Sequence, residues 1–339
     1  MKNIRSLVWI GSLIVLVFAA TVIAQDEDLA DLRVTGAWAR SGEVMSGAYL
    51  RIYNDGQVDE QLVAVRIPDG MAEIHESLMQ NDVMRMRPVD AITIPAGGMV
   101  ALEPGGYHIM LMEFGNPLLE GDSVRLTLVF ASGAEITVEA GVSQTPIPNE
   151  LAPDALTDLS LAAVNNGIYV GQVVNPPMQV QDFAAPGSAP ELMQLSDTDG
   201  TWRVIFFGYM HCPDFCPLTL VDYRRVKALL GEAADDVTFM FISIDSVRDT
   251  PDAVHRYLEN FDPAFVGFSP DDDTLSRIQP DYGFYYERRL DTGTQAVYTI
   301  DHSTRSYLLD RQGVLRASFA YDTEPQHIAN ALLWYMENE

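Results

Sequence analysis

The first half of the chain alternates apolar and polar residues over short runs, which is typical of β-strands with one buried face. These runs are rich in β-branched and aromatic residues, and clusters of Gly, Pro and Asn separate them. We expect strands at residues 48–53, 62–67, 91–94, 124–130 and 135–139, with turns at 54–56, 95–98 and 104–106. Repeated short strands without a clear helix predict an all-β sandwich or barrel over residues 30–142.

The second half, residues 168–339, follows a different pattern. Short, continuous apolar runs, as expected for strands buried on both faces, occupy residues 204–207, 237–244 and 307–309. Helical periodicity covers residues 220–230, 252–260 and 327–336. Strands and helices in alternation predict an α/β sheet with helices on both faces.

Between the two halves, the periodicity breaks down. Residues 143–167 contain Pro146, Pro148 and Pro153 among scattered polar residues, with a short helix expected at 151–164. We interpret this segment as a linker.

The N-terminus has the features of an export signal. Lys2 and Arg5 precede an apolar run that ends at Ala24, a small residue of the kind found at cleavage sites. The run of about 18 residues is also near the lower limit for a membrane-spanning helix, so residues 1–24 are either a signal peptide or an N-terminal membrane anchor. Both interpretations place the rest of the chain outside the cytoplasm, in the periplasm or at the outer face of the cytoplasmic membrane.

The charge of the chain narrows the choice of partners. Its 339 residues include 48 acidic and 21 basic ones, which gives a formal net charge of -27. Such a surface repels phosphate backbones, so we expect no nucleic-acid partner. A hydrophobic content of 47% allows each half to bury a core of its own.

The chain has two cysteines, Cys212 and Cys216, placed where the apolar run 204–207 passes into a helical pattern. Residues four apart share one face of a helix, so both sulfurs can point into one site. A disulfide across so short a loop gives about 2 kcal/mol in the chain-entropy model, which favours a chemical over a structural role. Two thiols at a helix N-terminus suit either disulfide exchange or a soft metal ion.

Spacing and a distant histidine help to choose between these two chemistries. Thioredoxin-type oxidoreductases place two residues between the cysteines, whereas this chain has three. Two thiolates leave a metal ion short of ligands, and His302, just before the strand at 307–309, is our candidate for the third. The alternative is a redox-active pair, with Cys212 as the nucleophile and Cys216 as the resolving thiol.

Several motifs make this half resemble the Sco/SenC family. They are GYMHCPDFCP at 208–217, VRDTP at 247–251, DHS at 301–303 and YLLD at 307–310. The resemblance covers about residues 168–339 and implies a thioredoxin-like fold, together with a role in assembling the dinuclear copper centre of cytochrome c oxidase. One departure is Met210, where the family commonly has a small polar residue, and we expect this side chain to pack.

The resemblance also implies a ligand set. It assigns Cys212, Cys216 and His302 as copper ligands. Cu(I) is soft and accepts two thiolates and an imidazole at low coordination number, and the same site is expected to accept Cu(II). A disulfide between the two cysteines would remove both thiolates, so copper binding would depend on the redox state of the pair.

The first half has no cysteine, but it concentrates His and Met in two segments, residues 74–88 and 106–112. Side chains alternate between the two faces of a strand, so His108 and Met110 point the same way. A single Met usually fills a gap in a core. Two imidazoles among several thioethers, however, favour Cu(I) over Zn or Mg.

The spacing His-x10-Met-x21-His-x-Met resembles the periplasmic PCu(A)C copper chaperones, as do WAR at 38–40, GAY at 47–49 and MRMRPV at 84–89. The resemblance spans about residues 32–142 and implies a cupredoxin-like Greek-key β fold with an exposed Cu(I) site. It assigns as ligands His75, Met86, His108 and Met110. The alternative thioethers are Met79, Met84 and Met112.

Together, the two resemblances imply an extracytoplasmic Cu(I) metallochaperone that supplies the copper-bearing subunit of cytochrome c oxidase during its assembly. Other copper chaperones or thiol reductants are further expected partners. The chain would be a metal carrier rather than an enzyme, with the linker at 143–167 tethering two sites so that Cu(I) can pass between them. Two alternatives remain open. One is a thiol–disulfide oxidoreductase that keeps oxidase or chaperone cysteines reduced, and the other is a protein that sequesters copper in the cell envelope.

Overall fold

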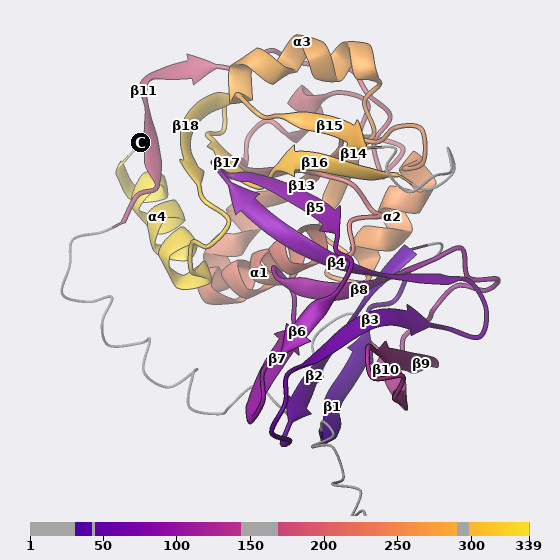
Figure 1. The fold of residues 1–339 in the computed structure, drawn as a ribbon. Coiled ribbons are helices and arrows are strands. Elements are labelled where there is room, and N and C mark those ends of the chain that lie inside the picture. Colours follow the sequence, from indigo (N-terminus) through magenta and orange to yellow (C-terminus); the bar gives the residue numbers. More distant parts are fainter. Residues whose placement is uncertain (1–30, 43–44, 144–168, 290–297, 339) are drawn as a thin grey trace, which may run out of the picture.

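The computed structural model describes residues 31–42, 45–143, 169–289 and 298–338 (Figure 1). In the described part of the first half every regular element is a strand, whereas the described part of the second half mixes strands and helices, so the predicted all-β and α/β classes are confirmed at this level. The predicted N-terminal segment 1–24, the helix at 151–164 and nearly all of the linker lie outside the described residues. Among the described helices, none is both long and apolar enough to span a bilayer.

The described residues of the first half form ten strands. They are β1 (Leu32–Ala39), β2 (Met45–Asn54), β3 (Glu60–Arg66), β4 (Met71–Gln80), β5 (Val83–Pro88), β6 (Ile92–Ile94), β7 (Gly98–Leu102), β8 (Tyr107–Met112), β9 (Ser123–Phe130) and β10 (Glu135–Val142). They pair in the order β5-β4-β8-β2-β1-β10-β9-β3-β6, with β7 also paired to β2. All pairings are antiparallel except that of β1 with β10.

On strands β4, β5 and β8, the Met and His side chains lie on one face of the sheet and the aliphatic side chains lie on the other. On β8, Ile109 and Leu111 belong to the aliphatic core of the first half, whereas Met110 and Met112 belong to the core cluster that includes the second half. Successive side chains project from opposite faces of a strand. The first half therefore turns an aliphatic face toward its own core and a face rich in His and Met toward the second half.

In the second half, the part that the structure describes contains eight further strands and four α-helices. They are β11 (Gln172–Gln179), β12 (Trp202–Gly208), α1 (Phe215–Leu230), β13 (Val237–Ser243), α2 (Pro251–Glu259), β14 (Val266–Phe268), α3 (Asp272–Tyr282), β15 (Tyr286–Arg289), β16 (Thr299–Ser303), β17 (Ser306–Leu309), β18 (Val314–Phe319) and α4 (Pro325–Asn338), with short 3-10 turns at Leu195–Thr198 and Gly231–Asp236. Six of these strands form a sheet in the order β11-β18-β17-β12-β13-β14.

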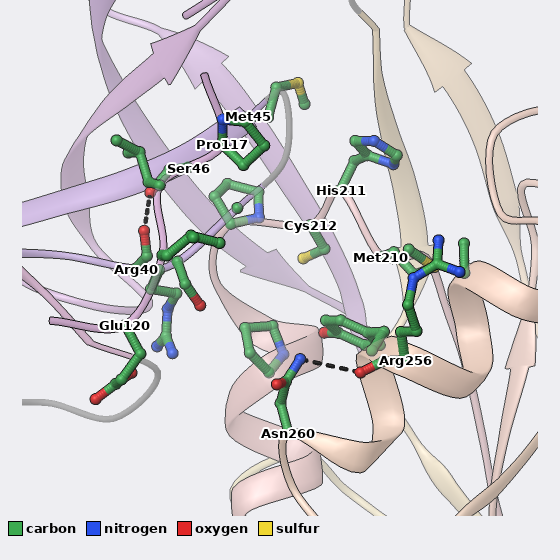
Figure 2. Close-up of a pocket in the computed structure, with 18 of the residues that line it drawn as sticks. Arg40, Met45, Ser46, Pro117, Glu120, Met210, His211, Cys212, Arg256 and Asn260 are labelled. Carbon is green, nitrogen blue, oxygen red and sulfur yellow. Dashed lines mark hydrogen bonds between the residues drawn. The ribbon is translucent and has the colours of Figure 1, made fainter. Parts of the chain in front are cut away.

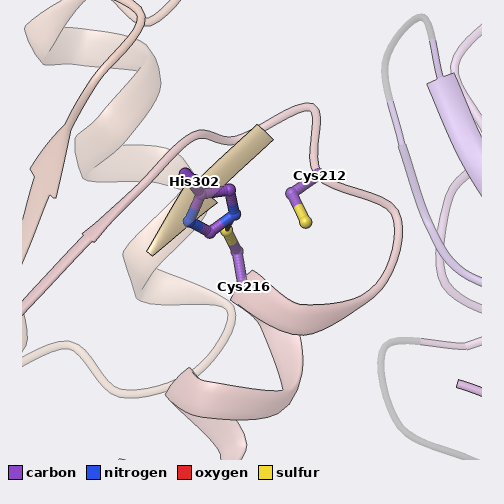
Figure 3. Close-up of side chains that lie close together, drawn as sticks. All are labelled: Cys212, Cys216 and His302. Carbon is purple, nitrogen blue, oxygen red and sulfur yellow. Dashed lines mark hydrogen bonds between the residues drawn. The ribbon is translucent and has the colours of Figure 1, made fainter. Parts of the chain in front are cut away.

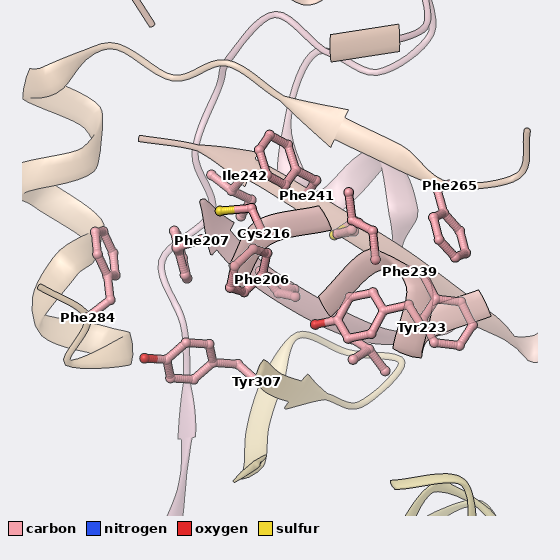
Figure 4. Close-up of a cluster of buried hydrophobic side chains, with 14 of the residues drawn as sticks. Phe206, Phe207, Cys216, Tyr223, Phe239, Phe241, Ile242, Phe265, Phe284 and Tyr307 are labelled. Atoms are coloured by element: carbon pink, nitrogen blue, oxygen red, sulfur yellow. The ribbon is translucent and has the colours of Figure 1, made fainter. Parts of the chain in front are cut away.

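The strands β12 and β13 run parallel and are almost entirely buried, as their continuous apolar sequences predict, and β14 pairs in parallel with β13 at the edge of the sheet. Aromatic rings fill the core beside them, with Phe207 stacked on Phe284 at 4.0 Å between ring centroids (Figure 4). Cys216 lies within this cluster (Figure 4). The base of the cysteine site is therefore part of a tightly packed core.

Several elements do not follow from the sequence patterns. The strand β15 reads Tyr-Glu-Arg-Arg and β11 contains two prolines, so neither has strand-like periodicity. The helix α3 is mostly polar; it begins where the Asp271 carboxylate accepts a hydrogen bond from the Thr274 N–H at 2.8 Å and ends at Gly283 in the left-handed region. Tertiary packing and capping, rather than hydrophobic periodicity, define these elements.

The two halves are joined by strand pairing. The antiparallel pair β15–β16 of the second half adds to the edge of the first-half sheet, because β16 pairs with β5 (Figure 1). The register places His302 opposite Met84 and Ser303 opposite Val83. One sheet of 12 strands therefore continues from the first half into the second.

Candidate functional site

Three predicted ligands of the second half meet at one point (Figure 3). Cys212 lies on the loop after β12, Cys216 in the first turn of α1, and His302 on β16. Their ligand atoms all lie within 4.8 Å of one another, and the Cys216 sulfur is 3.6 Å from His302 Nε2. Both cysteines are free thiols. The arrangement brings two sulfurs and one imidazole nitrogen together without a disulfide.

The imidazole of His302 is held in one orientation. Its Nδ1 is 2.7 Å from the carbonyl oxygen of Ser303, and because a carbonyl oxygen can only accept, Nδ1 carries the proton. The rings of Phe206 and Tyr209 pack edge-on against the imidazole. The Nε2 lone pair is consequently directed to the sulfurs, as in a metal-binding histidine whose other nitrogen is hydrogen-bonded.

The two thiols differ in acidity. Burial raises the pKa of Cys212, but interactions with the neighbouring Cys216 and His302 outweigh it and hold this pKa well below the usual value. Burial raises the pKa of Cys216 well above the usual value, and the neighbouring Cys212 raises it further. Of the two thiols, Cys212 is therefore the more acidic.

The four predicted ligands of the first half share one face of its sheet. His75 lies on β4, Met86 on β5, and His108 and Met110 on β8. His75 is directly opposite His108, with the ring centroids 5.9 Å apart. Met86 and Met110 are opposite the residues two positions after and two positions before His75, so both flank it on the same face. The predicted grouping is present in the structure.

In each imidazole of this group, one ring nitrogen is hydrogen-bonded and the other has no hydrogen-bond partner among the described residues. His75 Nε2 is 3.0 Å from a carboxylate oxygen of Glu73, and His108 Nδ1 donates to the Gly106 carbonyl at 3.1 Å. Within the described part of the chain, His75 Nδ1 and His108 Nε2 are buried and have no hydrogen-bond partner. Burial also lowers the pKa of His75, despite the hydrogen bond to Glu73. A neutral imidazole with an unpartnered nitrogen is ready to bind a metal ion.

The expectation of an exposed site in the first half is wrong for this chain. The exposed fractions are 2% for His75, 3% for Met86, and 0% for His108 and Met110. The second half covers them, because the loop that carries Cys212 crosses the face rich in His and Met. The two predicted sites thus face each other across one interface, and the site residues of both are buried.

Asp214, between the two cysteines, anchors this loop to the first half. Its carboxylate accepts a hydrogen bond from the Ser77 hydroxyl at 2.7 Å and from the Gly105 N–H at 2.8 and 2.9 Å. Beside it, the Tyr49 hydroxyl donates to the Pro213 carbonyl at 2.8 Å. A side chain at Gly47 would collide with this contact, since an added Cβ would lie 2.6 Å from the Tyr49 oxygen and 3.2 Å from the Pro213 oxygen. Sequence reasoning did not identify this contact.

A second line of contacts runs along β5 and β16. Arg87 forms a bidentate ion pair with Asp301, at 2.9 and 2.7 Å. Farther along, Arg305 donates to the Asp82 carboxylate at 2.7 Å, and the Thr304 N–H donates to the Asp82 carbonyl at 3.1 Å. Arg87 follows the predicted ligand Met86, and Asp301 precedes the predicted ligand His302. The contacts that join the halves therefore also hold ligand-bearing backbone segments together.

The alternative thioethers of the first half have different surroundings. Met84 and Met112 are fully buried in the cluster that contains both cysteines. Met79 is 40% exposed, and its sulfur lies 3.6 Å from the Thr304 hydroxyl. Met84 and Met112 thus remain close enough to the interface to contribute sulfur.

A cavity of about 440 Å³ opens beside Cys212, between the two halves (Figure 2). Its lining includes Arg40 and Met45 from the first half and Met210 and His211 from the second. The partly buried Met210 packs against the core, as expected from the sequence, and also borders this cavity. The cysteine loop therefore borders a cavity on one side.

A second group of potential ligand atoms, His211, Asp245 and Asp249, has a structural explanation. Arg248 and the Tyr298 hydroxyl already occupy the Asp245 carboxylate. Asp249 accepts hydrogen bonds from the Met210 N–H at 2.9 Å and the Ser243 hydroxyl at 2.7 Å. Asp249 thereby fixes the backbone that leads into the cysteine loop.

Comparisons with known proteins match both halves. The sequence model of the SCO1/SenC family matches residues 175–337, and that of the LpqE-like lipoprotein family matches residues 32–142. Among solved structures, ScoI of Bradyrhizobium japonicum, described with copper bound, is 34% identical, with a TM-score of 0.40, and the match covers 47% of this chain and 97% of ScoI. The copper-bound PCuAC domain from PmoF2 is 25% identical, with a TM-score of 0.29, over 33% of this chain and 92% of that domain.

One relative covers more than a single half of the chain. The SenC protein of Rhodobacter capsulatus is 30% identical over 213 residues, which represent 62% of this chain and 90% of SenC. The motifs around Cys212, Cys216 and His302 lie inside the region matched by the SCO1/SenC family model. This chain therefore belongs to the SCO1/SenC family and carries, ahead of that region, a second one similar to LpqE-like lipoproteins.

Proposed function

We propose that this protein is an extracytoplasmic Cu(I) metallochaperone that delivers copper to the dinuclear centre of cytochrome c oxidase during its assembly. The proposal rests on one observation. Two sets of soft donor atoms, one on each half, lie on opposite sides of one buried interface. Copper is the cargo in this proposal. Membership of the SCO1/SenC family supports it.

We assign the first cargo site to Cys212, Cys216 and His302. Two sulfurs and an imidazole nitrogen within 4.8 Å of one another match the preference of Cu(I) for soft ligands at low coordination number. The site would also accept Cu(II), and binding of either ion displaces thiol protons. A disulfide between the cysteines would switch this site off.

We assign the second cargo site to His75, Met86, His108 and Met110. Two imidazoles and two thioethers suit Cu(I) and form a poor site for Zn or Mg. The unpartnered Nδ1 of His75 and Nε2 of His108 are the nitrogens that would bind the ion. Because this set contains no thiol, it would keep its affinity when the cysteines are oxidised.

The domain organisation that we propose follows from the same assignment. Residues 30–142 form a copper-binding domain of the cupredoxin-like Greek-key type, and residues 168–339 form a thioredoxin-like domain. Residues 143–167 link the two, and residues 1–24 export the chain or anchor it to the membrane. The copper-bearing oxidase subunit is the proposed recipient, and copper chaperones or thiol reductants are further proposed partners.

A thiol–disulfide oxidoreductase is the second candidate. The lowered pKa of Cys212 beside the raised pKa of Cys216 favours it, because the thiol of lower pKa is the attacking group in disulfide exchange. In that case the chain would reduce oxidase or chaperone cysteines. Rapid turnover of a disulfide substrate that is unaffected by His302→Ala would support this candidate over metal delivery.

Cu(I) stoichiometry tests the assignment of both sites. Competition with a chromophoric chelator is measured on the full chain, on Cys212→Ser/Cys216→Ser and on His75→Ala/Met86→Ala. We expect about two Cu(I) for the parent chain and about one for each double variant, because each removes one soft donor set. His255→Ala, at an exposed position on α2, serves as the control. A stoichiometry that neither double variant changes would refute the assigned sites.

The recipient is tested in cells. Deletion of the gene is expected to lower cytochrome c oxidase activity under copper limitation, and the full chain is expected to restore it. Normal oxidase activity combined with copper sensitivity would instead support sequestration of copper in the envelope, the third candidate.

A further inference from the structure

Met84 lies between the two proposed copper sites, on the strand that joins the halves. In the pairing of β5 with β16, Met84 is directly opposite His302. Directly opposite residues project from the same face of a sheet, with Cβ atoms about 4.5–5.5 Å apart. Two positions along β5, Met86 projects from that same face. Met84 therefore neighbours one proposed ligand of each site.

The surroundings of Met84 are dry and rich in soft donors. Its side chain is fully buried, in the cluster that also contains Met86, Met110, Cys212 and Cys216. A leucine of similar volume would fill the same space, so packing alone does not require sulfur at this position. A thioether is a neutral soft ligand that does not form disulfides, which suits brief contact with Cu(I).

We propose that Met84 is a relay ligand, which carries Cu(I) from the His and Met site to the cysteine site while the two halves are docked. The inference rests on the proposed function and adds a residue and a route to it. A copper–sulfur bond to Met84 forms as the bond to Met86 breaks. The bonds to His75, His108 and Met110 then break as His302 Nε2 and the sulfurs of Cys212 and Cys216 bind copper and displace Met84. Copper stays in the +1 state throughout, no electrons move, and the thiol protons that copper displaces pass to solvent.

A loading experiment on the full chain tests the relay. With Cys212 and Cys216 oxidised to a disulfide, one equivalent of Cu(I) is bound at the first-half site. A phosphine reductant then opens the disulfide, and thiolate-to-copper charge-transfer absorption reports the arrival of Cu(I) at the cysteines. Thiol release is followed in parallel on copper-free protein, which separates the rate of reduction from the rate of transfer.

The variant Met84→Leu is compared with the parent chain and with Met99→Leu, a matched substitution at an exposed position on β7. We expect Met84→Leu to slow the transfer by about tenfold or more, which corresponds to about 1.4 kcal/mol of barrier, and Met99→Leu to leave it unchanged. The rate should not depend on protein concentration, because the step is intramolecular. Equal transfer rates in Met84→Leu and the parent chain would overturn the relay.

Methyl NMR of the parent chain provides a measurement that needs no variant to transfer copper. With 13C-labelled methionine methyl groups, addition of substoichiometric Cu(I) to the reduced chain is expected to shift or broaden the Met84 signal and to leave the Met99 signal in place. A Met84 signal that does not respond contradicts the relay.

Cu(I) stoichiometry, measured on the same samples, distinguishes failure of the proposed function from failure of the relay. A parent chain that binds fewer than about two Cu(I) contradicts the proposed function itself. A parent chain that binds two, with unchanged transfer in Met84→Leu, contradicts the relay alone. Loss of one bound Cu(I) in Met84→Leu also contradicts it, because Met84 would then be a terminal ligand of one site.

Discussion

Arg87 and Asp301 form a bidentate ion pair across the two halves, one position away from a proposed copper ligand on each strand. Asp301 is 1% exposed and also accepts a hydrogen bond from Arg289 at 3.1 Å. Burial raises the pKa of Asp301, but the two guanidinium groups outweigh it and keep this pKa below its usual range. The pair therefore links the docking of the halves to the alignment of β5 with β16.

Removal of this ion pair should loosen the docked arrangement. Arg87→Gln leaves a buried carboxylate with only Arg289 as a charged partner, at a cost of about 1–3 kcal/mol. We expect Cys212 to react faster with a thiol-alkylating reagent, because separation of the halves exposes the loop. Arg125→Gln is the matched control, since Arg125 pairs with Glu139 within the first half and is exposed. Equal alkylation rates in both variants would contradict a docking role for Arg87.

The contacts of Asp214 should control the protection of the first-half site. Asp214→Ala leaves the Ser77 hydroxyl and the Gly105 N–H without their acceptor, at about 1–3 kcal/mol for each buried group. Hydrogen exchange of the Gly105 amide is expected to accelerate. Ser77→Ala removes one of these bonds but leaves the acceptor of Gly105, so its effect on that amide should be smaller. An amide that exchanges equally slowly in Asp214→Ala would show that the loop is held by other contacts.

His302 should determine the affinity of the cysteine site for Cu(I). In His302→Ala the two sulfurs remain, but the third ligand is lost, and we expect the affinity to fall by about 10–100-fold. Chelator competition on a chain that also carries His75→Ala/Met86→Ala isolates this site. His327→Ala, on α4, is the histidine control. An unchanged affinity in His302→Ala would leave the thiols as the sole ligands.

Oxidation of the two cysteines should abolish Cu(I) binding at the cysteine site and leave binding at the His and Met site intact. Conversion of Cys212 and Cys216 to a disulfide removes both thiolates, so we expect the parent chain to bind about one Cu(I) instead of about two. His75→Ala/Met86→Ala, oxidised in the same way, is expected to bind none. Two Cu(I) bound by the oxidised parent chain would show that the second ion does not depend on the thiols. X-ray absorption of the oxidised sample should show nitrogen and thioether ligands only.

Much of the chemistry could be predicted from local pattern. The alternation on β8 puts His108 and Met110 on one face. The two cysteines do lie at a helix start, but the expected shared helix face is wrong, because α1 begins at Phe215 and Cys212 lies on the loop before it. Continuous apolar runs in the sequence predicted the strands β12 and β13. Such features depend on residues close together in the sequence, where helix and strand geometry alone decide which side chains share a face.

Other features could not be predicted, because they depend on residues far apart in the chain. Asp214 and Ser77 are 137 positions apart, and Arg87 and Asp301 are 214 apart. Nothing in the sequence around β15 or β16 indicates pairing with β5. The predicted exposure of the first-half site was wrong for the same reason, since the covering loop comes from the other half.

The sequence by itself determined which donor atoms are present and which near neighbours, such as His108 and Met110, share a face, since strand alternation acts over a few residues. The tertiary structure alone decided that the two sets face each other, that both are buried, and that Met84 lies beside His302. The physical reason is that edge pairing of β5 with β16 and the burial of Asp214 are gained only when the two halves meet.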